Sequence, residues 1–82
     1  MQTEVDIQYF AQFREIAGTS SAKIAIETGD TTASVYLRLA EQHGFPLGLP
    51  DIRIAVNDEF TTLDHPLSGG EKIVFIPPVA GG

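Results

Sequence analysis

The chain has 82 residues, enough for one domain whose core takes most of the apolar side chains and leaves few to line a catalytic pocket. Its net charge of −6 argues against nucleic acid and anionic membranes as partners, because both are bound through an excess of Lys and Arg. The lack of cysteine excludes disulfides, thiolate zinc sites and a persulfide on the chain itself.

The first third of the chain switches between strand and helix periods. Residues 4–10 alternate between apolar and polar side chains, which predicts a half-buried strand. Apolar residues then recur at helical spacing up to Gly18, which predicts a short helix ended by a left-handed glycine. Residues 22–27 return to a period of two and predict a second strand.

The main helix is predicted in the stretch GDTTASVYLRLAEQHG, residues 29–44. Asp30 or Thr31 can cap its first amides, and Gly44 can end it. A loop rich in Pro and Gly follows over residues 46–50.

The rest of the chain predicts three more strands. Residues 52–56 alternate, and a tight turn at Asn57 and Asp58 leads into a short strand around Phe60. Residues 72–76 are apolar on both faces, which is typical of a strand in the middle of a sheet.

This order predicts the α+β class, with a mixed sheet of four to five strands, one main helix across one face and a short helix after the first strand. If the first strand pairs in parallel with the last, the result is the β-grasp arrangement of ubiquitin-like proteins. We expect a β-grasp domain over residues 1–76 and an extended tail over residues 77–82.

Several bulky apolar residues remain outside the predicted core. Phe10 has the strand parity of polar neighbours, Phe60 lies just past a turn, and either Phe75 or Ile76 must face away from the helix. Clustered on an uncovered sheet face, they would form an apolar patch that marks a partner-binding surface. Single exposed residues are also common, but the adjacent tail favours the interface.

The sequence ends on FIPPVAGG. Two prolines cannot continue a central strand, and the residues after them narrow toward glycine, so this end could enter a tight channel. Either the glycine end is simply disordered, or the carboxylate of Gly82 is the reactive group. The predicted tail comprises Pro77, Pro78, Val79, Ala80, Gly81 and Gly82.

Two other signals carry little weight. His43 and His65 lack further ligands at usable spacing, so no metal site is predicted. The N-terminal stretch MQTEVDIQYF lacks the regions of a signal peptide, and no apolar run approaches the ~20 residues of a membrane span. We therefore expect a cytoplasmic protein.

Three stretches resemble the small subunits of molybdopterin synthase, a family of β-grasp sulfur carriers. The matching stretches are YFAQFREIAGT (9–19), AVND (55–58) and DHPLSGGEKIVFIPPVAGG (64–82). The resemblance runs over most of the chain, while residues 28–50 match only as a helix and a loop.

The resemblance implies a carrier that is not catalytic alone and binds no cofactor itself. An E1-like adenylyltransferase would use ATP to adenylate Gly82, and a sulfurtransferase would supply the sulfur of a thiocarboxylate. The tail would then enter the large synthase subunit and donate sulfur to cyclic pyranopterin monophosphate in molybdenum cofactor biosynthesis. Family contacts fall on positions matching Phe10, Phe60 and Ile76, with isoleucine replacing the usual aromatic. Arg14 matches a family arginine, although a solvated helix charge also explains it.

Other functions remain open at this point. A sulfur carrier for thiamine thiazole synthesis shares the chemistry, but such carriers are usually shorter and lack a segment like FAQFREIAG. A ubiquitin-like modifier would instead join Gly82 to a lysine of a target protein. A plain interaction domain with an inert tail is the remaining possibility.

Overall fold

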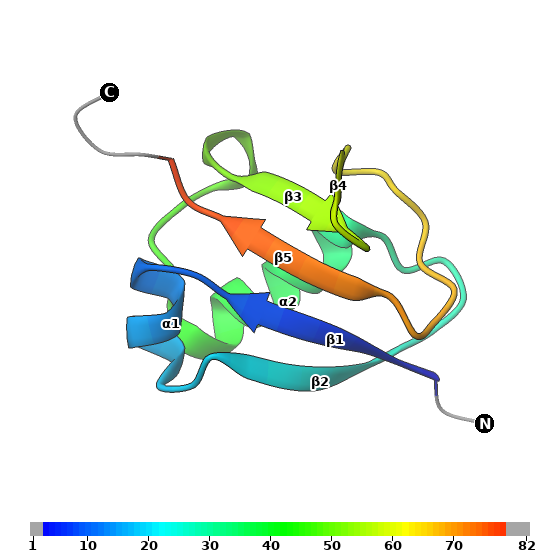
Figure 1. Ribbon diagram of the computed structural model, residues 1–82, viewed down its shortest axis with the longest axis horizontal. Coiled ribbons are helices and arrows are strands. Elements are labelled where there is room, and N and C mark those ends of the chain that lie inside the picture. The colour runs from blue at the N-terminus through cyan, green and yellow to red at the C-terminus, as the bar shows by residue number, and fades with distance from the viewer. Residues whose placement is uncertain (1–2, 79–82) are drawn as a thin grey trace.

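In the computed structural model, which describes residues 3–78, five strands form one mixed sheet with the longest helix packed behind it (Figure 1). The strands lie in the order β2-β1-β5-β3-β4. The elements are β1 (Thr3–Tyr9), α1 (Gln12–Ala17), β2 (Ser21–Ile26), α2 (Thr32–His43), η1 (Leu49–Asp51), β3 (Arg53–Val56), β4 (Glu59–Thr61) and β5 (Lys72–Ile76).

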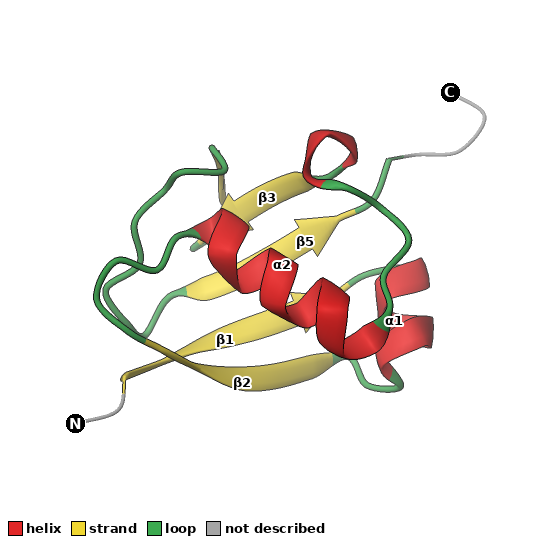
Figure 2. Ribbon diagram, turned by 180° about the vertical axis from the view of Figure 1, so that it is seen from behind, coloured by secondary structure: helices red, strands yellow, loops and turns green. Residues whose placement is uncertain are grey.

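The centre of the sheet confirms the predicted β-grasp topology. β1 and β5 run parallel, with Ile7 opposite Ile73 and Tyr9 opposite Phe75, while every other neighbouring pair is antiparallel. The α2 helix crosses one face of this sheet, as Figure 2 shows from behind. The fold is therefore of the predicted α+β class, and its sheet has five strands.

The boundaries of α2 follow from its capping residues. The Thr31 side chain accepts a hydrogen bond from the Ser34 N–H (3.2 Å), and Ser34 Oγ accepts one from the Thr31 N–H (2.8 Å). Of the two predicted candidates, Thr31 is thus the N-cap, in a reciprocal capping box. Asp30 supports it through Ser34 Oγ and the Arg38 guanidinium. Gly44, with φ of 73°, ends the helix as predicted.

Two further segments bear on the sequence expectations. Asn57 and Asp58 have φ of 52° and 72°, so they form the predicted tight turn between β3 and β4. For the segment before β3, the sequence predicts only a loop. It instead contains η1, where Pro50 lies in the first turn and its missing N–H costs no hydrogen bond.

The core lies between α2 and the inner face of the sheet and is rich in aromatic rings. Tyr36 of α2 packs edge-on against Phe75 with ring centroids 5.2 Å apart, and Phe13 of α1 lies 4.7 Å from Phe45. The Tyr36 hydroxyl donates to the Leu47 carbonyl (2.7 Å), so this buried ring keeps a polar partner. These contacts hold β5 and both α-helices together at the end of the sheet where β5 stops.

A buried carboxylate orders the turn that leads into β5. Glu71 accepts hydrogen bonds from the Ser68 N–H (2.9 Å), Ser68 Oγ (3.1 Å) and the Gly69 N–H (2.6 Å). Gly69 has φ of 119°, and a Cβ there would collide with the side chain of Thr3. Burial would raise the pKa of Glu71, but the hydrogen bonds from Ser68 and Gly69 outweigh it, so its pKa lies below the ordinary value of 4.5.

We expect Glu71→Gln to lower the free energy of unfolding by about 1–2 kcal/mol at pH 7, because the Ser68 N–H, the Ser68 hydroxyl and the Gly69 N–H all lose a charged acceptor. A lowered native pKa means that the unfolded chain binds more protons, so this stabilisation is complete above pH 4.5 and fades as pH falls through the native pKa. Urea titrations from pH 7 to pH 3 should show the two proteins converging. A difference in the free energy of unfolding that stays constant from pH 7 to pH 3 would contradict this role of the Glu71 carboxylate.

Candidate functional site

The outer face of the sheet, opposite α2, carries an apolar patch near the end of β5. Pairing register places Val74 beside Ala55, and Ala55 beside Phe60 of β4. Residues paired in register point to the same side, so these three share the outer face with Ile76. Phe10 follows Tyr9 of β1 and continues the outward parity. We define the outer patch as Phe10, Ala55, Phe60, Val74 and Ile76.

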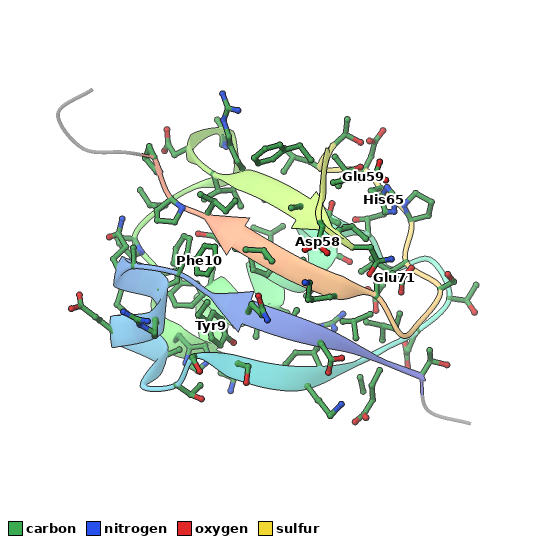
Figure 3. The ribbon with its side chains drawn as sticks, viewed as in Figure 1. Tyr9, Phe10, Asp58, Glu59, His65 and Glu71 are labelled. Atoms are coloured by element: carbon green, nitrogen blue, oxygen red, sulfur yellow. The ribbon has the colours of Figure 1, made fainter. Side chains whose placement is uncertain are left out.

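The rim of the outer patch is exposed and its centre is not. Phe60 is 68% exposed and Phe10 47%, whereas Ala55 and Val74 are buried. Phe10 lies on the outer face next to the end of β5 in Figure 3. Large exposed aromatic side chains around a buried apolar centre are typical of a protein contact surface.

One predicted interface residue belongs to the core. Phe75 is 0% exposed and faces Tyr36, so the prediction that it contacts a partner is wrong. Its direction follows from pairing, since it lies opposite core-facing Tyr9 and Ile54. Ile76, the other candidate, is half-buried and points outward.

The chain leaves the sheet at the edge of the outer patch. β5 ends at Ile76; Pro77 is buried and Pro78 is exposed. The other predicted tail residues lie outside the described residues, namely Val79, Ala80, Gly81 and Gly82.

Two arginines lie at this end of the molecule. Arg14 is exposed on α1. Arg53 begins β3 directly opposite Ile76, and its guanidinium lies over the Phe60 ring, 5.8 Å from the centroid. Sequence reasoning missed Arg53, although its alternation with buried Ile52 and Ile54 signals an outward direction.

A groove of about 560 Å³ adjoins the outer patch between η1 and β4. Its walls include Leu49, Ile52, Phe60 and Leu63. Asp64 lies at its margin, where a hydrogen bond from Thr62 Oγ1 (2.6 Å) holds the pKa of this carboxyl below its ordinary value. The groove is mainly apolar and adds contact area next to Phe60.

Over residues 3–78, no three His, Asp or Glu side chains lie close enough together to hold a metal ion. His43 stacks on Phe45, and His65 Nδ1 lies 2.9 Å from Thr61 Oγ1, so each ring has a structural contact. Within the same part of the chain, no helix is both long and apolar enough to cross a membrane.

Comparison with known proteins places this chain in a family. The model of the ThiS family matches residues 7–82. The molybdopterin synthase sulfur carrier subunit of Escherichia coli (strain K12) is 34% identical over 80 residues, covering 95% of this chain and 99% of that protein.

Solved structures agree in fold. A putative molybdopterin converting factor subunit 1 from Pyrococcus furiosus matches with a TM-score of 0.78 at 28% identity, covering 94% of this chain and 99% of that one. Subunit 1 in a complex of subunits 1 and 2 of the molybdopterin-converting factor from Helicobacter pylori 26695 matches with a TM-score of 0.61 at 28% identity, with 96% and 99% covered. Small archaeal modifier protein 1 from Methanosarcina acetivorans matches with a TM-score of 0.79 at 26% identity, with 100% and 99% covered.

Proposed function

The chain belongs to the ThiS family, and on this premise we propose that it is the sulfur-carrier small subunit of a molybdopterin synthase. The E. coli relative carries the name of that subunit, and the similarity spans nearly the whole of both chains. The observation that carries the proposal is the outer patch, which surrounds the point where β5 ends and residues 77–82 begin.

The proposed chemistry takes place on Gly82. A C-terminal carboxylate, with a reference pKa of about 3.3–3.7, is an anion at neutral pH and resists nucleophiles. An E1-like partner would join it to AMP from ATP with release of pyrophosphate. Sulfur from a sulfurtransferase persulfide would then displace AMP, and reduction of the resulting acyl disulfide by a thiol would leave a thiocarboxylate. These partners supply the acid–base groups for each step.

The proposed acceptor of the tail is the large synthase subunit. The H. pylori relative was solved as a complex of its subunits 1 and 2, which supports an equivalent assembly for this chain. Within it, the outer patch would bind the large subunit, and the thiocarboxylate would donate sulfur to cyclic pyranopterin monophosphate. Arg14 would contact the same partner from α1.

Mass spectrometry of the C-terminal peptide tests this function. With the activating enzyme, ATP and a sulfur donor, we expect a gain of about 16 Da on the C-terminal peptide, because sulfur replaces one oxygen. Omission of ATP is the control and should leave the mass unchanged. If the complete mixture, active on its own cognate carrier, leaves this chain unmodified, the proposal fails.

A second function has one specific observation in its favour. The structural match to an archaeal modifier protein is as close in fold as the match to a converting-factor subunit. If the chain is a modifier, Gly82 will be recovered in an isopeptide bond to lysines of other proteins. A sulfur carrier for a thiazole pathway would instead pass the mass test but fail to support molybdopterin formation with the large subunit.

A further inference from the structure

Arg53 lies beside the end of β5, where the chain leaves the sheet. It lies opposite Ile76, the last residue of β5, and side chains directly opposite on neighbouring antiparallel strands are about 4.5–5.5 Å apart at Cβ. Residues 77–82 begin at the next position along the chain. We therefore expect a protein that takes in those residues to contact the surface around Arg53.

The Arg53 guanidinium has no carboxylate partner among residues 3–78, in contrast to most cations of the chain. Lys23 pairs with Asp6 (2.9 Å), Arg38 with Asp30 (3.0 Å) and Lys72 with Asp58 (2.8 Å). Arg53 instead rests on the face of Phe60. The chain has eleven acidic residues and a net charge of −6. Arg53 nevertheless lies on the Phe60 ring beside the outer patch, where its guanidinium can face a partner.

A partner that buries the Arg53 guanidinium must supply a counter-charge to it. Covering a guanidinium without a counter-charge is strongly unfavourable, whereas a carboxylate can accept two parallel hydrogen bonds from it. Contact with Phe60 limits the orientations of the guanidinium before binding, so less freedom is lost when the pair forms.

We propose that Arg53 is a specificity-determining residue that recognises a carboxylate on the tail-receiving partner, set beside an apolar side chain that packs on Phe60. The inference rests on the proposed function, because it takes the large synthase subunit as that partner. Although the chain is acidic overall, its contact surface presents a cation to an acidic group at this position.

The test compares two glutamine variants that each lose one positive charge from the same sheet face. Lys23 is opposite Asp6 in register, so it shares the outer face but lies on edge strand β2, away from the outer patch. Titration calorimetry with the large subunit should show that Arg53→Gln raises the Kd by about tenfold or more, while Lys23→Gln changes it little. Arg53→Gln should also reduce the salt dependence of binding, because one ion pair is lost.

Cross-linking identifies the group that Arg53 meets. The chain contains two lysines, Lys23 and Lys72, so Arg53→Lys adds one traceable amine. A carbodiimide, which joins amines to carboxylates in direct contact, should link the introduced lysine to an Asp or Glu of the large subunit. Charge reversal of that acid, combined with Arg53→Glu, should restore binding.

The outcomes separate this inference from the proposed function. Equal Kd values for both glutamine variants, or a cross-link from the introduced lysine to the chain's own Gly82, would overturn the role of Arg53. Either result leaves the sulfur-carrier function standing if the unaltered chain still binds the large subunit. Failure of the unaltered chain to bind would overturn both.

Discussion

Addition of one alanine after Gly82 should abolish formation of molybdopterin while leaving the fold intact. One extended residue moves the terminal carboxylate by about 3.5 Å. A displacement of even ~1 Å at a reacting centre costs about a hundredfold in rate. The folded residues 3–78 are unchanged, so the loss comes from the position of the reactive group. Molybdopterin formed by the reconstituted synthase is the measurement.

The matched control is one alanine inserted before Thr3, at the opposite end of the molecule from the end of β5 (Figure 1). Both proteins should unfold at the same urea concentration as the unaltered chain, and only the C-terminal addition should lose activity. A longer chain that still delivers sulfur at the normal rate would show that the Gly82 carboxylate is not the carrier.

β1 and α2 were predictable because each has one periodic apolar face. In β1, polar residues alternate with the buried Val5, Ile7 and Tyr9, so only one face can turn toward α2. The α2 helix carries its own capping residue and closing glycine. These signals are local, and the tertiary contacts of the fold agree with them.

The error at Phe75 has a physical cause. β5 is apolar at four successive positions, Ile73 to Ile76, so alternation cannot tell the inner face from the outer one. Only the pairing register with β1 determines which face of the sheet each β5 side chain takes. That pairing joins segments more than sixty residues apart in the sequence. The same pairing logic brings Arg53 beside Ile76, which no single stretch of sequence displays.

Outer-patch contacts dominate binding if the proposed assembly is correct. Phe10→Asp should raise the Kd for the large subunit by about 30-fold or more, which corresponds to loss of a hot-spot contact of ~2 kcal/mol. The substitution replaces a half-exposed aromatic ring by a charge that the partner would have to bury. Because Phe10 lies between β1 and α1 and outside the core, the free energy of unfolding should change by less than about 0.5 kcal/mol.

Leu37→Asp is the matched control for this substitution. Leu37 is 52% exposed, against 47% for Phe10, and both variants replace an exposed apolar side chain by the same negative charge. Leu37 lies on α2, across the sheet from the outer patch (Figure 2). Calorimetry should therefore detect a large loss of affinity for the large subunit in Phe10→Asp alone. Equal losses of affinity in the two variants would indicate a general charge effect. A loss of affinity in Leu37→Asp alone would indicate that the partner binds the helical face and not the surface near the end of β5.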